Sequence, residues 1–466
     1  MSDFKLDENS HGARIIARFP PSPTGWFHIG NARTALFNYF FVKKNGGKLL
    51  FRLEDTDKER SKNEYALDIV EGLKWLGIDI DFNKPYKQSE HGETYRKYIE
   101  KMIAEDKAYI SKEKIDTNKE WKGGMTQVMN LRNEVIRLRN PGKKIVFEDM
   151  IRGEISVDTA ELGDFVIAKS LDEPIYHLAV VIDDFEMGVN HVIRGEDGIY
   201  NTPRQILIQE AIGAPRPIYA HMPFILNTDR SKLSKRQQGE LVSLKYYREK
   251  GYLPEAMVNY LAFLGWNPGD EREIMSMGEI IEAFDIMKVQ KAGAVFNPEK
   301  LLWINKEYLK RLPEENIILE IKKRLPENCQ DEKIVRKIFK TILERISIWS
   351  DIDKMIEDGD IQYYFLEPNI SKDMIVWKKG GTIEQAKEYL ALVLNILEKI
   401  SDSDFSLEII KEKIMPLAEE KGKGNVLWPL RVVLSGKEKS PDPFTLLDLL
   451  GREVSLKRIK NIINTL

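Results

Sequence analysis

One stretch near the N-terminus restricts the local fold of the chain more than any other. It begins with the apolar residues 15–19, passes through three prolines and Gly25, and continues into the apolar run 35–42. The first segment is typical of a buried strand, the second of a stiff turn and the third of a helix. Because a strand–turn–helix unit directs backbone N–H groups and a helix N-terminus at one point, it favours a bound phosphate group.

A second stretch, residues 231–236, contains a group of cations that directly follows a predicted strand. Lys232 and Lys235 are separated by Leu233 and Ser234, and Arg236 comes next. Scattered lysines usually form a solvated surface, but lysines in a loop at the end of a strand are well placed to bind a polyphosphate. Together the two stretches predict an ATP site that is divided between two halves of one sheet.

The composition is that of an ordinary globular protein with about two to four domains. Of the 466 residues, 42% are hydrophobic and 31% are charged. The first ten residues contain no apolar signal region, and no later run is long and apolar enough to span a bilayer. We therefore expect a cytoplasmic protein without membrane contact. Because the formal net charge is only −3, any RNA-binding surface must be a local patch.

The pattern of the chain changes three times along its length. In residues 13–110 and 186–240, strand-like runs alternate with helical ones, which is typical of a parallel α/β sheet. Residues 111–185 are interrupted by polar and glycine-rich stretches, and the alternation in 151–157 predicts antiparallel strands in an inserted segment. The chain after residue 240 is mainly helical. The predicted α/β elements are strands at 48–53, 191–194 and 218–226 and helices at 65–76 and 203–212.

Taken in order, the motifs resemble those of bacterial-type glutamyl-tRNA synthetases, which are class I aminoacyl-tRNA synthetases, and the resemblance covers essentially the whole chain. The matching segments are Arg18-Phe-Pro-Pro-Ser-Pro-Thr-Gly25 with His28-Ile-Gly30, Arg52-Leu-Glu-Asp-Thr-Asp57, Tyr176-His-Leu-Ala179 with Val181-Ile-Asp-Asp184, Val192-Ile-Arg-Gly-Glu-Asp197 with Asn201-Thr-Pro-Arg-Gln205, Lys232-Leu-Ser-Lys-Arg236, 252–261 with 264–266, Trp428-Pro-Leu-Arg431 and 449–451.

The resemblance implies an α/β fold in which a Rossmann-like parallel sheet of the class I synthetase type is followed by helical domains. The two halves of this catalytic domain would be residues 13–110 and 186–240. Between them, residues 111–185 would form an inserted α+β segment that binds the acceptor end of tRNA. Residues 241–312 would form a helical domain that contacts the RNA stem, and residues 313–466 an all-helical anticodon-binding region.

The resemblance also implies a glutamate–tRNA ligase that uses ATP, with Mg²⁺ bound together with the nucleotide. The catalytic residues would be His28, Lys232 and Lys235, which would stabilise charge on the phosphates in the transition state. A lone histidine more often caps a helix, but its position two residues before Gly30 favours the catalytic interpretation. The implied ATP-binding residues are Thr24, His28, Gly30, Asn31, Lys232, Ser234, Lys235 and Arg236.

The charged residues of the predicted strands indicate a pocket for an amino acid with two carboxylates. Arg18 interrupts an apolar strand, where an unpaired guanidinium would be costly, so it must either form an internal salt bridge or bind a substrate carboxylate. Glu54 would receive the ammonium group and Arg194 would help to hold a carboxylate, because the ends of neighbouring parallel strands meet at one crevice. The predicted glutamate-binding residues are Arg18, Pro20, Ser22, Glu54, Tyr176 and Arg194.

The implied partners are L-glutamate and tRNA(Glu), and the sequence leaves open whether tRNA(Gln) is charged as well. A monomer is the usual form of the family.

Cys329 is the single cysteine, so a zinc site built from several cysteines is excluded, and we expect neither zinc nor another metal held by the protein. The basic residues 457–460 are more often a solvated helix face. The insert would contact RNA through Arg132, Arg137, Arg139, Lys143 and Lys144.

Three alternatives differ from the preferred interpretation in identifiable residues. A glutaminyl-tRNA synthetase typically has Glu and Asn where this chain has Ser22 and Thr24. A short paralogue that modifies a tRNA base ends soon after the lysine loop, whereas this chain continues for about 230 residues. A non-catalytic tRNA-binding paralogue would be expected to lose His28 or Lys235. One departure from the family pattern is Gly198, where a larger residue, often His, is usual, so the pocket contacts near it stay open.

Overall fold

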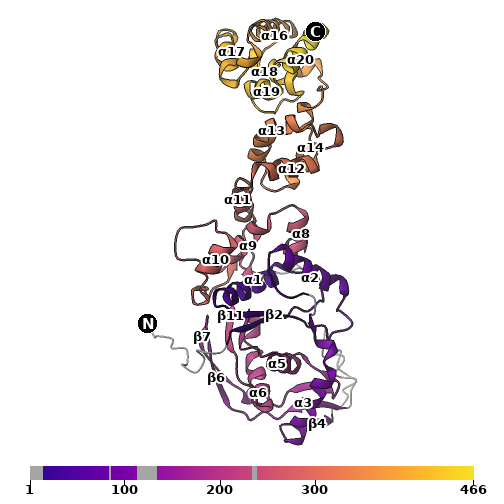
Figure 1. Cartoon of the computed structure of the whole chain (residues 1–466), viewed down its shortest axis with the longest axis vertical. Helices are drawn as coiled ribbons and strands as arrows, with labels where there is room; N and C mark the ends of the chain where they lie inside the picture. The colour runs from indigo at the N-terminus through magenta and orange to yellow at the C-terminus, as the bar shows by residue number, and fades with distance from the viewer. Residues whose placement is uncertain (1–13, 83–84, 113–133, 234–238) are drawn as a thin grey trace. The chain divides into compact units, whose positions relative to one another are not determined.

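The computed structural model describes residues 14–82, 85–112, 134–233 and 239–466, and the chain divides into two compact units. The first is Met1–Tyr308 and the second is Leu309–Leu466 (Figure 1). The first unit contains the α/β sheet and the second is helical, as the sequence predicts. The finer five-part division by residue number stays a prediction.

A seven-stranded sheet forms the centre of the first unit, with the strand order β3-β2-β1-β10-β11-β6-β7. All neighbouring strands are parallel except β6 and β7, which confirms the predicted parallel α/β sheet. Its strands are β1 (Ile16–Phe19), β2 (Lys48–Leu53), β3 (Tyr86–Lys87), β6 (Lys144–Asp149), β7 (Gly153–Asp158), β10 (His191–Gly195) and β11 (Ile218–Met222).

Helices pack against the sheet because most residues of its central strands are apolar. Helix α1 (Ile29–Lys44) packs against β1, β2 and β10, and it is buried along most of its length. Helices α5 (Tyr176–Glu186) and α6 (Thr202–Ile212) pack against each other and, with α3 (Gly92–Ala104), enclose a core that includes Val192 and Tyr219 of the sheet (Figure 1). Helix α2 (Asn63–Trp75) contains most of the predicted 65–76 helix.

The inserted part of the chain forms a second sheet with the order β4-β5-β8-β9, and all of its pairs are antiparallel. Its strands are β4 (Ala108–Lys112), β5 (Glu134–Leu138), β8 (Val166–Ser170) and β9 (Glu173–Pro174). Of the alternating residues 151–157, for which the sequence predicts antiparallel strands, 153–157 lie in β7, which pairs antiparallel with β6. These two strands extend the main sheet rather than the second one, because β6 pairs with β11.

The predicted strand 218–226 is also wrong as a single element. It divides at Pro223 into β11 and the short β12 (Ile225–Leu226), which pairs with β13 (Ala294–Val295) in another sheet. Proline has no N–H group and therefore cannot continue a ladder of donors. The Pro223 carbonyl instead accepts a hydrogen bond from the buried Arg33 of α1, which also donates to the Leu264 carbonyl.

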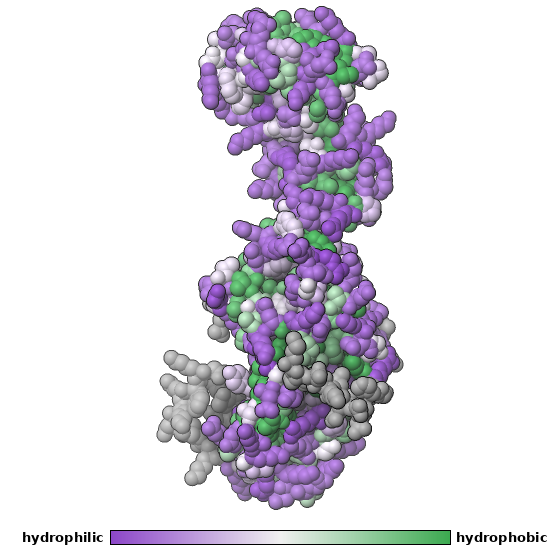
Figure 2. Space-filling model, turned by 90° about the vertical axis from the view of Figure 1, so that its left-hand side faces the viewer, coloured by the Kyte–Doolittle hydropathy of each residue, from purple (hydrophilic) through white to green (hydrophobic). Residues whose placement is uncertain are grey.

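The remaining chain is helical, and the helices described here include none with both the length and the apolar character needed to cross a membrane. Hydrophilic residues cover most of the visible face of both units (Figure 2). The first unit adds α8 (Leu244–Glu249), α9 (Pro254–Phe263), α10 (Met277–Ala283) and most of α11 (Pro298–Leu309). The second contains α12 (Glu314–Arg324), α13 (Glu332–Arg345), α14 (Ser350–Glu357), α15 (Lys372–Ile375), α16 (Ile383–Glu398), α17 (Leu407–Lys421), α18 (Lys423–Ser435), α19 (Pro443–Leu450) and α20 (Arg452–Thr465).

Candidate active site

The register of the parallel strands gathers charged side chains on one face of the main sheet. Arg18 in β1 lies opposite Leu50 in β2, and Arg194 in β10 lies opposite His221 in β11. Because side chains alternate along a strand, Arg52 shares the face of Leu50. The predicted site residues Arg18 and Arg194 therefore lie on one face of the sheet together with Arg52, toward its carboxyl edge and beside α5.

Arg18 forms the internal salt bridge that the sequence leaves open, and it retains a donor as well. Its Nε lies 3.1 Å from both carboxylate oxygens of Asp184 in α5. The residue is 2% exposed, and its buried Nη1 has no hydrogen-bond partner among the described residues. An unused buried N–H is costly in a finished protein core. The salt bridge with Asp184 is therefore confirmed, and the binding of a substrate carboxylate by Arg18 stays a prediction, for which Nη1 is available.

Arg52 and Asp184 are parts of this site that the sequence analysis does not assign. Arg52 Nη1 donates to Asp184 Oδ1 at 2.7 Å, and its Nη2 donates to Glu54 Oε1 at 3.2 Å. Burial alone would raise the pKa of Asp184, but the charges of Arg18 and Arg52 lower it. The one available signal is a pair of aspartates in the apolar run of α5, because buried carboxylates require cationic partners.

Glu54 follows the last residue of β2 and is 8% exposed. Burial raises its pKa above the ordinary value, although Arg52 and Arg18 act in the opposite direction. When burial disfavours the ionised form of a carboxyl group, a cation that comes close to it stabilises that form. The binding of the substrate ammonium group by Glu54 stays a prediction, which its burial beside the carboxyl end of β2 supports.

Tyr176 and Arg194 complete the group of charged and polar residues around Glu54. Burial raises the pKa of the Tyr176 hydroxyl, and the charge of Glu54 raises it further, while Arg194 and Arg18 lower it. These electrostatic interactions connect the four predicted residues in one site. Arg194 Nη2 donates to the Gly198 carbonyl at 3.0 Å and to Thr202 Oγ1 at 2.8 Å, whereas its buried Nη1 has no partner in the described part of the chain.

The predicted phosphate-binding turn has the expected form. His28 is the N-cap of α1, and its Nδ1 accepts a hydrogen bond from the Gly30 backbone N–H at 2.9 Å. The side chains of Ser22, Thr24 and Asn31 are exposed. Pro20 is half-buried at the end of β1. An N-terminus of this type, with exposed polar residues around it, suits an anionic group.

The described chain on the C-terminal side of the lysine loop contacts this turn, whereas the N-terminal side contacts β12 and Phe224. Lys232 forms a bridge with Leu226, and its Nζ lies 3.9 Å from the centre of the Phe224 ring. Ser234, Lys235 and Arg236 lie outside the described residues, so their predicted roles stay predictions. After residue 238 the chain returns to the turn, where Leu244 N–H donates to the Phe27 carbonyl at 2.8 Å and Ser243 bridges with His28.

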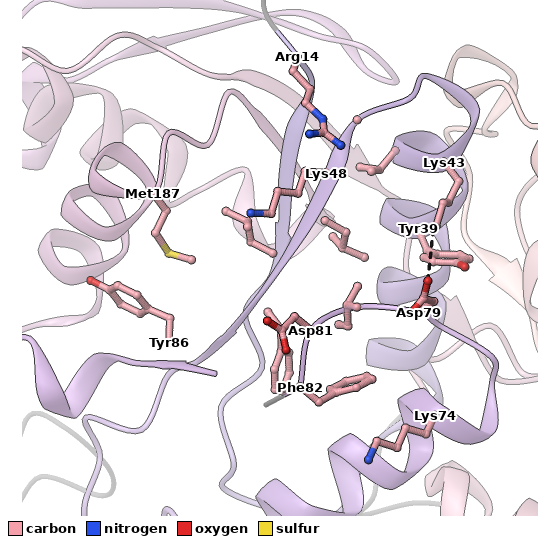
Figure 3. Close-up of a pocket in the computed structure, with 16 residues that line it drawn as sticks. Arg14, Tyr39, Lys43, Lys48, Lys74, Asp79, Asp81, Phe82, Tyr86 and Met187 are labelled. Atoms are coloured by element: carbon pink, nitrogen blue, oxygen red, sulfur yellow. Dashed lines mark ion pairs between the residues drawn. The ribbon is translucent and has the colours of Figure 1, made fainter. Parts of the chain in front are cut away.

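A cavity of about 790 Å³ lies beside the N-terminal half of β2 (Figure 3). Figure 3 shows Lys48 and Phe82 among its lining residues and the ion pair of Lys43 with Asp79 at its side. None of the predicted site residues lines this cavity. We therefore place the candidate active site at the opposite end of the strands, where the unused donors lie.

The basic residues of the insert are largely paired within the protein. Arg139 contacts Asp106 and lies over the Tyr109 ring, while Lys143 pairs with Glu210 at 2.8 Å. Arg137 donates to the Asp164 carbonyl at 2.7 Å. Lys144 is exposed, and Arg132 lies outside the described residues. The RNA contacts of the insert stay a prediction.

The basic residues 457–460 belong to the second unit. There Lys460 pairs with Glu398 at 2.7 Å, which is consistent with a solvated helix face.

The fold and the site define an α/β protein with a group of charged side chains at the carboxyl ends of its parallel strands, which is where open sheets of this kind bind ligands. Residues 14–134 and 119–303 match the family model for the catalytic domain of tRNA synthetases class I (E and Q). Residues 306–463 match the anticodon binding domain. The chain belongs to the class I tRNA synthetases of this E and Q family, which confirms the resemblance seen in the sequence.

Relatives and solved structures agree with this assignment over nearly the full length. A glutamate–tRNA ligase of Thermodesulfovibrio yellowstonii is 37% identical, with 97% of this chain and 99% of the relative covered. One of Aquifex aeolicus is 39% identical, with 97% and 100% covered. The crystal structure of a glutamate tRNA ligase from Elizabethkingia meningosepticum in complex with its amino acid is 34% identical, has a TM-score of 0.83, and covers 97% of this chain and 100% of its own.

Proposed function

We propose that the chain joins L-glutamate to the 3′-terminal ribose of tRNA in a reaction driven by ATP. The observation that carries this proposal concerns two guanidinium groups, those of the buried Arg18 and the half-buried Arg194, each of which has a buried Nη1 without a partner among the described residues. Glu54, with its raised pKa, interacts with Arg18 beside them. Two cations and one carboxylate complement an amino acid with two carboxylates and one ammonium group.

In the first step, the α-carboxylate of glutamate attacks the α-phosphate of ATP, and pyrophosphate leaves. Arg18 and Tyr176 would bind the side-chain carboxylate, Glu54 the ammonium group and Arg194 a carboxylate. Pro20 and Ser22 would line the pocket. Fixing the attacking oxygen in this way removes much of the entropic barrier. The product is glutamyl-adenylate, a mixed anhydride.

His28 and Gly30 at the start of α1 would face the phosphates, with Thr24 and Asn31 beside them. Lys232, Lys235 and their neighbours Ser234 and Arg236 would neutralise the charge that develops as the α-phosphate becomes five-coordinate. Mg²⁺ would come with the nucleotide, because this ion is usually bound through substrate phosphates and water rather than by a cage of protein ligands.

In the second step, a terminal ribose hydroxyl of tRNA attacks the anhydride and AMP leaves. Orientation and phosphate electrostatics are sufficient for both steps, so no side chain acts as a covalent nucleophile. We infer that tRNA(Glu) is the RNA substrate, that tRNA(Gln) is a second candidate, and that the protein acts as a cytoplasmic monomer. The family resemblance also implies that glutamate activation depends on bound tRNA.

The test is glutamate charging of purified tRNA(Glu) and tRNA(Gln) transcripts, with Lys235→Ala as the control. Charging of tRNA(Glu) alone would establish a discriminating enzyme, and charging of both would indicate that a separate amidating enzyme completes Gln-tRNA(Gln). If a folded wild-type protein charges neither, the proposal is wrong and a non-catalytic tRNA-binding role takes its place.

A further inference from the structure

A buried pair of titratable residues lies on β11, which neighbours the strand of Arg194, and on β6 beyond it, and the reaction described above uses neither residue. Asp149 ends β6 and His221 lies in β11, and they are 1% and 0% exposed. His221 Nδ1 lies 2.6 Å from Asp149 Oδ2. The strand register places both residues on the face of the sheet that carries Arg194.

The surroundings of Asp149 determine which nitrogen of His221 carries the proton. Oδ1 of Asp149 accepts backbone N–H groups from Ile151 at 3.0 Å and from Arg152 at 2.8 Å. Burial alone would raise the pKa of Asp149, but these donors and His221 lower it, so it is an acceptor only. Burial also lowers the pKa of His221, against the hydrogen bond to Asp149. His221 is therefore neutral, with its proton on Nδ1 and a lone pair on Nε2.

The lone pair on His221 Nε2 accepts a hydrogen bond from Arg194. The Nε–H of Arg194 donates to His221 Nε2 at 3.1 Å, while Nη2 donates to Thr202 Oγ1 and to the Gly198 carbonyl. Three acceptors thus fix one side of the guanidinium. Nη1 is the nitrogen left without a partner in the described chain, so its direction is set by the groups that hold the other two.

Gly198 provides the space in which Arg194 lies. A Cβ atom built at residue 198 would stand 2.3 Å from Arg194 Nε and 2.7 Å from its Cδ. Both distances are far below van der Waals contact, and the second atom is in the stem of the side chain rather than at its end. Any larger residue at this position would therefore force Arg194 out of its contacts with His221 and Thr202.

We propose that His221, held by Asp149 with its proton on Nδ1, is a positioning residue for Arg194, and that glycine at 198 is required for the same arrangement. The inference rests on the proposed role of Arg194 as a ligand of a glutamate carboxylate. His221 touches neither substrate in this scheme. It acts by aiming the unused Nη1 at the substrate.

The first test measures KM values in tRNA-dependent, glutamate-dependent ATP–pyrophosphate exchange. We expect His221→Met, which removes the acceptor, and Gly198→Ala, which fills the space, each to raise the KM for glutamate about tenfold or more, the size expected when a hydrogen bond to a charged group is lost. The KM for ATP should change less than about twofold. His221→Gln, which keeps an uncharged acceptor, should restore most of the affinity for glutamate.

Matched controls come from the same molecule. His191→Gln replaces a buried histidine of β10 that lies on the opposite face of the sheet, against Phe41 of α1. Gly278→Ala adds a Cβ atom where nothing lies within 4 Å. Both should leave the KM for glutamate unchanged. Thermal melting of every variant checks that the protein is folded.

A second measurement tests the proton position without using activity. The chain has six histidines, so ¹⁵N-histidine labelling gives a small set of imidazole signals, and His221→Gln identifies the one from His221. We expect the Nδ1-protonated tautomer in the wild type. Asp149→Asn should reverse it, because the amide oxygen would stay with the two backbone donors and its NH₂ would face Nδ1. This nearly isosteric variant should also raise the KM for glutamate.

The outcomes separate the two proposals. An inactive wild-type protein that is folded contradicts the proposed function itself. An active wild type whose glutamate KM is unchanged in folded His221→Met and Gly198→Ala variants overturns the positioning role alone. The same holds if the wild-type signal shows a proton on Nε2, or if the KM values for glutamate and ATP rise together.

Discussion

Buried arginines occur in both compact units, but their hydrogen-bonding groups are used in different ways. In the second unit, Arg458 of α20 is 5% exposed and donates to the backbone carbonyls of Tyr363, Leu366 and Leu434. In the first unit, Arg18 is also buried, yet it faces a carboxylate and keeps an unused Nη1. The carbonyl contacts of Arg458 stabilise the fold, whereas the Nη1 of Arg18, beside the charged residues Glu54 and Asp184, is available to a ligand.

Replacement of Arg18 should have the largest effect. In Arg18→Met, we expect kcat/KM for glutamate activation to fall by about 10³, because one partner of a buried charged contact is missing in the substrate complex. The fold should persist, since Asp184 keeps its 2.7 Å contact with Arg52. Pyrophosphate exchange at varied glutamate and ATP measures this. An equal rise in both KM values would show that Arg18 supports the whole site rather than the glutamate pocket.

Arg458→Met is the matched variant in the other unit. It leaves three carbonyls without their donor, so we expect the second unit to lose about 2–4 kcal/mol of its free energy of unfolding. Peptide-resolved hydrogen exchange should locate the loss in residues 309–466. The KM for glutamate should stay within twofold of the wild type. If Arg458→Met has normal stability but binds glutamate weakly, Arg458 serves binding rather than the fold, and the contrast with Arg18 is wrong.

Glu54→Gln should have opposite effects on activity and on stability. The raised pKa of Glu54 means that its ionised form is disfavoured in the folded protein, so this group stabilises the fold below its unfolded pKa and loses that contribution as pH rises through its folded pKa. At pH 7.5 the variant should therefore be more stable by about 1 kcal/mol or less. Denaturant unfolding at pH 7.5 and at pH 4.5 measures the difference, which should shrink at the lower pH.

The same variant should activate glutamate about 10–100 times more slowly, because the substrate ammonium group loses its counter-charge. In the wild type, activity should decline on the acid side at a pH above the ordinary carboxyl value of 4.5. Activity profiles against pH for both proteins provide the check. If activity falls at the same low pH in Glu54→Gln as in the wild type, the group that titrates is not Glu54.

Lys457→Ala should have the smallest effect. The ammonium group lies 4.0 Å from Glu367 on an exposed helix face, and such pairs are worth little in water. We expect the free energy of unfolding to change by less than about 0.5 kcal/mol. The KM for tRNA in the charging reaction decides between a solvated face, where it is unchanged, and an RNA contact, where it rises and becomes less dependent on salt.

The parts of the fold that the sequence predicts are those governed by local pattern. The apolar segment before the prolines is β1, the following run is in α1, and residues 48–53 coincide with β2. The family resemblance supplies the order of the domains. The prediction of one strand over residues 218–226 is wrong although a local signal is present, because Pro223 indicates the end of a ladder.

The candidate site is predictable only in part, because its partners are distant in sequence. Arg18 and Asp184 are 166 residues apart, and Asp149 and His221 are 72 apart. The sequence shows that Arg18 needs a partner but cannot identify Asp184, since that depends on the packing of α5 beside β1. The unused Nη1 atoms likewise appear only when every other donor of each guanidinium has been assigned to an acceptor.

The close approach of Gly198 and Arg194 limits the order in which this site could change during evolution. Since even a methyl group at 198 would overlap the arginine, the two positions are epistatic, and a larger residue becomes tolerable only after the guanidinium has found another resting place. A lineage that acquires the glycine first gains a new arginine conformation. Once His221 and Thr202 hold Arg194 in that conformation, a single mutation from glycine back to a larger residue at 198 would displace the arginine and lower fitness.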